Sequence, residues 1–312
     1  MTPRQPTTSG DWPGHQGNWG RWPNDLGTIN LITPAVVRRA AAEIRSGVTV
    51  PCGRPLTGTE VTSRYDEPAV VHDMIKADAD GFEQGDLTQS AADRLTARIH
   101  GMTNTHLDAL SHMGYRGKSF NGHDFPAVVT MAERAKLMDI TPLLGLVTRG
   151  VLIDAAANRG VAYLQPGDSV TAADLGPGLD LLEPGDAAVI RTGGTLAGGQ
   201  AAERPSEHGT WHHGTWAGLD TAAVEALAQR DVSLICSDSP GDTFPHRHEA
   251  YVRSPVHVLC EVFYGLPLVH NMDLEELTRL CASQGQRRFL LSVSPLHLPG
   301  ATGSLVTPVA VL

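Results

Sequence analysis

The sequence is poor in cysteine and in aromatic residues. Its 312 residues include four cysteines, and phenylalanine, tyrosine and tryptophan together account for 5%. The cysteines are widely spaced, sit in apolar stretches and form no CxxC pair, so neither a disulfide framework nor a zinc knuckle is expected. We expect reduced core thiols of a cytoplasmic protein at Cys52, Cys236, Cys260 and Cys281.

Positive charge and long apolar runs are also scarce. Lysine and arginine number 24 against 34 aspartates and glutamates, and no basic run is present, so nucleic acid and anionic membranes are not expected partners. No segment reaches the roughly 18 consecutive apolar residues of a membrane-spanning helix. The polar first 18 residues, which contain Pro3, Pro6 and Pro13, resemble neither a signal peptide nor an anchor. The expected partner is a small-molecule substrate.

Histidine is abundant, with 14 residues against five tyrosines and six phenylalanines. The most informative segment is 105–112, THLDALSH. In an extended chain His106 and Asp108 project together, and a helix starting near Asp108 would place His112 above that carboxylate. Imidazole and carboxylate ligands suit Zn²⁺, Mn²⁺ or Fe²⁺ and leave positions open for water and substrate. The alternative is two ordinary half-buried histidines and a turn aspartate.

Other segments offer candidate site residues, each with a structural alternative. The glycine-rich loop 207–216, which includes His212 and His213, either lines a pocket or is solvated. Asp238 follows an expected buried strand, where ligands bind in α/β folds, but turn and cap roles are also common. His257 and His270, taken alone, are typical of core and loop histidines. No GxSxG or strand-GxGxxG-helix pattern points to a nucleophilic serine or a dinucleotide site.

The N-terminal segment 1–32 carries two closely spaced tryptophans, Trp19 and Trp22. Two aromatic side chains so close together usually pack against another part of the protein or against a partner. They either pack on their own domain or belong to an arm that reaches a neighbouring subunit or covers a pocket.

The remaining pattern alternates helices and strands, which predicts one compact α/β domain. The segment between the strands 48–51 and 95–102 is expected to be irregular. Helices are expected over 35–44, 221–229, 256–264 and 274–283. Further strands are expected over 150–156, 186–191, 232–237, 266–270, 288–294 and 305–312.

Together these segments resemble the cyclase family of metal-dependent hydrolases, which includes bacterial kynurenine formamidase and isatin hydrolase. The resemblance spans nearly the whole chain and is carried by 18–22, 26–31, 105–112, 231–232, 237–238, 254–257, 271–275, 289–296 and 303–309. It implies a single α/β domain over 33–312, of the swivelling β/β/α type, with a mixed, barrel-like sheet flanked by helices. The segment 1–32 would be an N-terminal arm.

The family motif is HxGTHxDxPxH. The resemblance implies that residues 105–112 of this chain have the roles of the matching motif positions. His106 and Asp108 would bind the metal, and His112 would transfer protons. The first ligand position of the motif falls on Met102, whose thioether is a poor ligand for Zn²⁺ or Mn²⁺. His100 would replace it only if the strand bulges. Leu110 stands at the motif's proline, as in larger members.

In members with two metals, a later histidine and an acidic residue complete the site. His257 matches that histidine, but His270 stands where the acid is expected. The implied ligand set is therefore His106 and Asp108 with one or more of His100, His257 and His270.

The resemblance implies a hydrolase that opens a small, often cyclic, amide, lactam or lactone with one divalent ion, Mn²⁺ or Zn²⁺. Metal-bound water would attack the carbonyl. The pocket would include Trp19, Trp22, His212, His213 and Asp238, and the protein would be a homodimer or homotetramer. Alternatives are a non-hydrolytic cyclase or dehydratase on the same scaffold and, given Met102 and His270, a metal-free binding protein.

Overall fold

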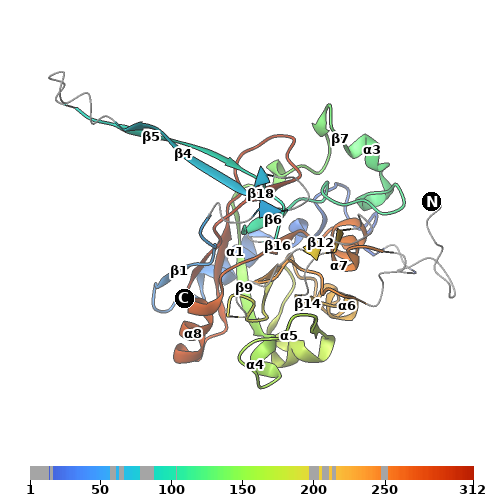
Figure 1. Ribbon diagram of the computed structural model, residues 1–312. Coiled ribbons are helices and arrows are strands. Elements are labelled where there is room, and N and C mark those ends of the chain that lie inside the picture. Colours follow the sequence, from blue (N-terminus) through green and yellow to red (C-terminus); the bar gives the residue numbers. More distant parts are fainter. Residues whose placement is uncertain are drawn as a thin grey trace.

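The computed structural model describes residues 14, 17–56, 61–62, 67–77, 88–102, 104–196, 204–205, 211–212, 216–246 and 252–312. Within them a mixed nine-stranded sheet curls into a half-barrel with helices on its faces, which confirms the expected single α/β domain (Figure 1). In sheet order the strands are β1 (Thr49–Pro51), β19 (Val309–Val311), β17 (Arg288–Val293), β9 (Leu146–Asp154), β11 (Ala187–Arg191), β15 (Leu234–Ser237), β16 (Leu268–His270), β6 (His106–Asp108) and β18 (Gly303–Leu305).

The four central strands, β9, β11, β15 and β16, run parallel, and the outer pairs are antiparallel. Every residue of β11 and β15 is buried, as expected for parallel strands covered on both faces. Successive side chains enter opposite cores: Val189 faces one cluster and Ile190 the other.

Helices cover both faces of this sheet. Leu277 and Cys281 of α8 (Glu275–Gln284) join the core that contains Val189, whereas α6 (Thr221–Ala228) joins the opposite core. The other helices are α1 (Pro34–Ala41), α3 (Phe125–Val128), α4 (Ala155–Asn158), α5 (Gly176–Leu181) and α7 (Pro255–His257), with 3₁₀ turns η1 (Gly27–Leu31), η2 (Phe120–Gly122), η3 (Thr141–Leu143) and η4 (Ala172–Leu175). No helix in these ranges is long and apolar enough to cross a membrane.

The segment expected to be one α-helix over 256–264 is instead α7 followed by a π-helix, η5 (Val258–Tyr264). π-Helical turns are uncommon and occur frequently at functional sites. The expected strand 305–312 is also wrong, because it is divided between β18 and β19. Pro308 separates them, and proline cannot donate a hydrogen bond to a sheet ladder.

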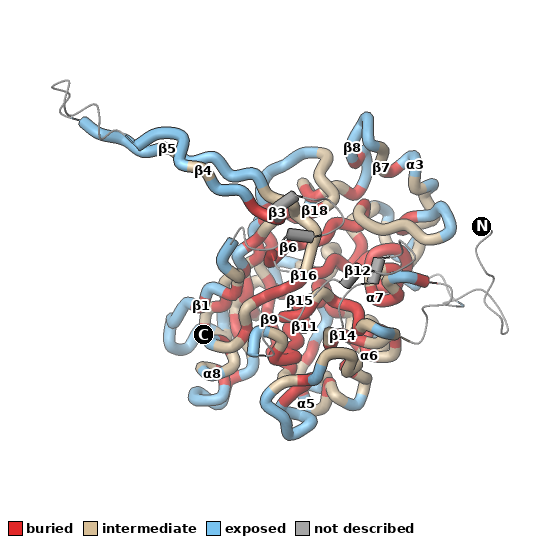
Figure 2. The backbone as a smooth tube through the Cα atoms, in the orientation of Figure 1, coloured by how far each residue is buried: buried red, intermediate tan, exposed pale blue. Residues whose placement is uncertain are grey.

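The segment expected to be irregular contains a long hairpin of β4 (Val70–Ala77) and β5 (Ala91–Ala97). It projects from the body of the molecule and is mostly exposed (Figures 1 and 2). The expected strand 95–102 is therefore wrong, since β5 ends at Ala97 and 99–102 form bends. The shorter paired strands are β2 (Val61–Thr62) with β3 (Glu67–Pro68), β7 (Val129–Thr130) with β8 (Arg134–Ala135), β10 (Ser169–Val170) with β14 (Gly218–Leu219), and β12 (Arg204–Pro205) with β13 (Trp211–His212).

The described part of the N-terminal segment packs on its own domain, which was one of the two alternatives. The Trp19 indole N–H donates to the carbonyl of Val262 at 2.6 Å, and the ring stacks on Phe263. Arg21 forms two bonds to the carboxylate of Asp231, at 2.6 and 2.8 Å. These contacts hold residues 18–22 against η5 and the segment before β15.

A buried ion network joins β9 to the start of β11. Arg149 donates to both oxygens of Asp186, at 3.1 and 2.7 Å, and both side chains are almost fully buried. Replacing Asp186 with alanine would leave a buried guanidinium without its main partner, so Asp186→Ala should lower the free energy of unfolding by roughly 3–5 kcal/mol.

Urea denaturation of the purified variants measures this change. The control is Asp180→Ala, which removes an exposed partner of Arg230 and should cost no more than about 1 kcal/mol. Equal losses in the two variants would contradict a structural role for the buried network.

Candidate metal centre

The strand β6, which lies between β16 and the edge strand β18, places the two motif residues. His106 and Asp108 lie on one face of β6, and Leu107 between them packs into the core on the other. The antiparallel neighbour β16 sets His270 directly opposite His106. Asp108 is 0% exposed, and the two histidines are almost as deeply buried.

Asp108 lies at the centre of a cluster of histidines. Its Oδ1 atom lies 2.7 Å from Nδ1 of His100 and 3.6 Å from Nε2 of His106. Its Oδ2 atom lies 3.0 Å from Nε2 of His270 and 3.8 Å from Nε2 of His257. All four histidines of the implied ligand set therefore converge on one carboxylate.

His100 and His112 reach this carboxylate by routes that differ from those expected. His100 arrives because the chain bends after β5, not because a strand bulges, and its Nε2 contacts the Thr302 hydroxyl at 3.0 Å. His112 arrives on a turn in which its own N–H bonds the carbonyl of Ala109 at 2.9 Å, and not on the helix that was considered as one way to bring it there. The two rings stack with centroids 3.8 Å apart.

In two of the rings, a hydrogen bond from the nitrogen that points away from Asp108 fixes the orientation of the ring. Nδ1 of His106 donates to the carbonyl of Asn104 at 2.8 Å, and Nδ1 of His257 donates to the carboxylate of Asp242. In each ring Nε2 is the nitrogen that faces Asp108. This pairing of the outer nitrogen with an oxygen is typical of metal-binding histidines.

A glycine is required where the backbone passes these rings. Gly241 has φ +95°, and a Cβ at this position would lie 2.6 Å from Cε1 of His270 and 3.3 Å from Cε1 of His257. A side chain would therefore collide with the cluster from the loop after β15.

Burial sets the charge state of the cluster. It lowers the pKa of His106 to about 4 and that of His112 to about 3. Both rings are therefore neutral near pH 7, the form in which imidazole binds a metal. Burial alone would raise the pKa of Asp108. The electrostatic effect of His112, His106 and His100, together with the hydrogen bond from His100, is larger than that of burial and holds this pKa well below its usual range.

Several buried atoms of the cluster lack hydrogen bonds. Oδ2 of Asp108 and both ring nitrogens of His270 have no partner of acceptable geometry among the described residues. The 3.0 Å contact between Asp108 and His270 is within ion-pair distance, but its angles do not suit a hydrogen bond. Unsatisfied buried polar atoms are costly, and a divalent cation would take up the lone pairs of Oδ2 of Asp108 and of one nitrogen of His270. The nitrogen and oxygen donors present fit such an ion.

One buried carboxylate at this site was not singled out from the sequence. Glu261, on η5, is 0% exposed, and its donor atoms lie within 4.8 Å of those of Asp108 and His257. Burial, Asp108 and Asp242 raise its pKa well above the usual range. Its position four residues after His257 in a helical segment was the signal available.

Asp238 holds the loop after β11. Its carboxylate accepts bonds from the N–H and hydroxyl of Thr192 at 2.8 and 2.7 Å, and from the N–H groups of Gly193 and Gly194 at 2.8 and 3.2 Å. These bonds fix the loop, and a role of Asp238 in the substrate pocket stays a prediction.

The structure does not test the pocket roles expected of the other residues. Trp19 and Trp22 pack beside Leu110 and Phe120, in a cluster adjoining the motif turn. His212 lies on β13, and His213 is outside the described residues. Their roles in a pocket also stay predictions.

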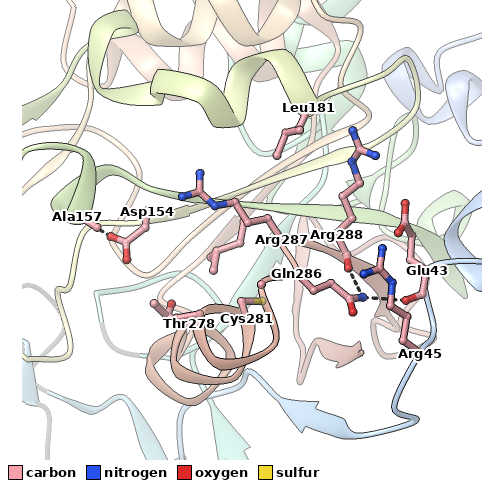
Figure 3. A pocket seen from close by; sticks show the side chains of 13 residues that line it. Glu43, Arg45, Asp154, Ala157, Leu181, Thr278, Cys281, Gln286, Arg287 and Arg288 are labelled. Atoms are coloured by element: carbon pink, nitrogen blue, oxygen red, sulfur yellow. Dashed lines mark hydrogen bonds between the residues drawn. The ribbon is translucent and has the colours of Figure 1, made fainter.

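A pocket of about 490 Å³ lies away from this cluster, among β9, β17, α8 and the segment after α1 (Figure 3). Three arginines, Arg45, Arg287 and Arg288, contribute to its wall, together with Gln286. None of the clustered histidines lines it, so the chemistry expected of the family motif belongs to the cluster around Asp108.

Comparisons with known proteins agree with this arrangement. A family model described as "Putative cyclase" matches residues 7–241. A solved structure described as a novel cyclase is 26% identical, with a TM-score of 0.81, over 96% of this chain and 100% of that one. A search of curated protein sequences gave no significant match.

Two isatin hydrolases share the fold. One, bound to the product analogue thioisatinate, is 15% identical, with a TM-score of 0.57, over 87% of this chain and 94% of that one. Isatin hydrolase A from Ralstonia solanacearum is 20% identical, with a TM-score of 0.55, over 89% of this chain and 98% of that one. Because the family model covers well over half of the sequence, the chain belongs to the cyclase family.

Proposed function

We propose that the protein is a metal-dependent hydrolase that opens a small, cyclic amide, lactam or lactone. The observation that carries this proposal is the convergence of four histidines on the fully buried carboxylate of Asp108. Fold neighbours named as isatin hydrolases support hydrolysis of a carbon–nitrogen bond in a ring.

The proposed ligands are His106 and Asp108, with His100, His257 and His270 as further donors. This mixture of imidazole and carboxylate suits Mn²⁺ or Zn²⁺. When bound, such an ion supplies Lewis acidity, which polarises a carbonyl oxygen and makes water more acidic.

His112 is the proposed proton-transfer residue. Its ring stacks on that of His100, and its donor atoms lie within 4.8 Å of those of His100 and Asp108. A neutral imidazole accepts a proton from attacking water and returns it to the leaving nitrogen or oxygen. The proposed pocket walls are Trp19, Trp22, His212, His213 and Asp238.

A second candidate function is ring closure or dehydration on the same scaffold. The relative that is 26% identical is described as a cyclase, which favours this candidate. Hydrolysis adds one water to the substrate and ring closure with loss of water removes one, so the mass of the product separates the two functions.

We also propose a cytoplasmic homo-oligomer, either a dimer or a tetramer. All four cysteines are unpaired and buried, as expected for a reducing compartment. The hairpin β4–β5 exposes Met74, Ile75 and Leu95 by more than half, and a two-stranded ribbon is only marginally stable in water on its own. We propose that the β4–β5 hairpin packs against a second copy of the chain.

Metal content tests the ligand assignment. Protein purified without chelators should contain at least one divalent ion per chain. His106→Ala should weaken metal binding by more than the roughly 10–100-fold that loss of an outer-shell partner costs, because a direct donor is removed. Elemental analysis measures the bound metal. His123→Ala, at a partly exposed histidine paired with Asp25, is the control, and undiminished metal in His106→Ala would exclude the proposed site.

Product analysis tests the reaction and the role of His112. Incubation with cyclic imides, lactams and N-formyl arylamines should give a product heavier by one water. His112→Asn should lower kcat by roughly 10²–10⁴-fold, because general acid–base catalysis is lost, with metal content unchanged. Mass spectrometry and initial rates provide the measurements. A His112→Asn enzyme as fast as wild type would remove the proton-transfer assignment.

Light scattering tests the oligomer. The wild-type chain should have a mass of two or four copies. Replacing Met74 and Ile75 with serine should shift it toward one copy, because the exposed apolar surface of the hairpin is removed. Met131→Ser, at a fully exposed methionine on the β7–β8 turn, is the matched control. A wild-type chain with the mass of one copy would contradict the proposal.

A further inference from the structure

The pocket of about 490 Å³ among β9, β17 and α8 takes no part in the proposed reaction. Its volume lies within the range of small-molecule sites. Leu152 and Cys281 line it and are almost fully buried, so the pocket reaches down to the core that contains Val189. The apolar part of its wall is completed by Ala157, Leu181 and Ala282. A ligand in this pocket would therefore place an apolar group against these side chains.

The polar part of the wall carries positive charge. Arg45, Arg287 and Arg288 line the pocket, and across the described ranges none of the three forms an ion pair. Arg288 acts on Glu183 only electrostatically, and that glutamate is already paired with Arg149 at 2.8 Å. The chain as a whole has a formal charge of −10, so a general excess of positive charge does not explain three unpaired arginines around one pocket.

The acidic residues of the wall are engaged with other arginines. Glu43 lies 3.3 Å from Arg149, and Asp154 lies 3.0 Å from Arg191. Asp154 also accepts the N–H of Ala157 at 2.9 Å, so its carboxylate caps α4. Arginine binds carboxylate and phosphate groups through paired N–H donors. The charge that remains in the wall therefore suits an anion.

Gln286 fixes the part of the wall that carries the arginines. Its side chain is buried, and its amide donates to the carbonyl of Glu43 at 2.8 Å and to that of Arg288 at 2.7 Å (Figure 3). These bonds join the segment that leads to Arg45 with the start of β17. The two segments that supply the arginines are therefore held together without a ligand.

Three buried atoms of this wall have no hydrogen bond among the residues that the structure describes. They are Nε of Arg288, the hydroxyl of Thr278 and Oε1 of Gln286. Two of the three are donors. Unpaired buried polar atoms are uncommon in folded proteins because each one costs free energy. The chain alone therefore does not satisfy the polar groups of this wall.

We propose that this pocket binds a small organic anion, a carboxylate or a phosphate monoester on an apolar body, at a site separate from the metal centre. The arginines bind the anionic group, and the apolar body packs against Leu152, Leu181 and Cys281. Figure 3 shows the side chains of Arg287 and Arg288 extending toward the side of the pocket where Leu181 lies. The inference does not depend on the proposed hydrolase function.

Isothermal titration calorimetry of the full-length chain tests the inference, with phenyl phosphate and benzoate as probes. Wild type should bind at least one of these anions at one site per chain, and the ratio of their affinities separates a phosphate site from a carboxylate site. Benzamide, which has the shape of benzoate without its charge, should bind at least about 10-fold more weakly than benzoate. Inorganic phosphate should bind more weakly than phenyl phosphate, because it leaves the apolar wall uncovered.

Four variants locate the site. Arg287→Gln and Arg288→Gln should each weaken binding of the anion roughly 10–100-fold, because each removes a charged donor. Arg38→Gln, at an exposed arginine of α1 outside the pocket, should bind as wild type does. His106→Ala alters the metal centre and should also bind the anion as wild type does. Circular dichroism establishes that each variant is folded, and if Arg288→Gln does not fold, the exposed Arg287 still decides.

The outcomes separate this inference from the proposed function. Loss of binding in His106→Ala would place the anion at the metal centre and overturn the inference while the hydrolase proposal stands. Equal affinity in Arg287→Gln and wild type would overturn it as well, and equal affinity for inorganic phosphate and phenyl phosphate would overturn the organic class of the ligand. Binding of no probe would leave Arg287 and Arg288 as cations at the end of α8, without a ligand. A site that is weakened in Arg287→Gln and kept in His106→Ala would support the inference even if no tested amide is hydrolysed.

Discussion

The structure of the site depends on one buried charge, the carboxylate of Asp108. A carboxylate with no solvent exposure stays ionised only when nearby groups stabilise its charged form. Here that stabilisation comes from imidazoles on several separate segments. His100 follows β5, His106 lies on β6 and His112 lies on the turn after β6. His257 lies on α7 and His270 on β16. The register between β6 and β16 is therefore a functional constraint, because a shift by one residue would turn His270 away from the cluster.

Loops at the carboxyl ends of the parallel strands hold these ligands in place. Asp238, after β15, accepts four bonds from the segment after β11, and so ties the two loops together. Asn271, after β16, adopts a left-handed conformation with φ +56°, and its amide donates to the carbonyls of Gly101 and Asn104 at 2.9 and 3.1 Å. This second pair of bonds fixes the bend that carries His100. Residues outside the cluster thus fix the backbone around it, which is the role that outer-shell partners have in metal sites.

Periodic patterns account for the parts of the fold that sequence reasoning predicted. The buried runs of β11 and β15 and the helices α6 and α8 have clear apolar patterns and were placed within a few residues. The hairpin β4–β5 was missed because both its faces meet solvent, so its sequence shows no apolar alternation. Alternation along an extended chain predicted the pairing of His106 with Asp108. A helix was considered as the way to bring His112 to the same carboxylate, but a turn brings it there instead. Glu261 was missed because the apolar pattern of 256–264 indicated an ordinary core helix.

The departures from the family motif make sense once donors are compared in space instead of by position in the sequence. Met102 lacks a nitrogen donor, but the bend after Ala97 brings His100 to 2.7 Å from Asp108, so an imidazole still contacts this carboxylate. His270 replaces an expected acid and removes one negative charge, and Glu261 places another within reach of His257 from a different element. In both cases a residue displaced in sequence supplies the same chemical group near the same atom. The site therefore gathers imidazole and carboxylate groups around one buried carboxylate, and two of them, His100 and Glu261, are carried by backbone irregularities, the bend at 99–102 and the π-helix η5.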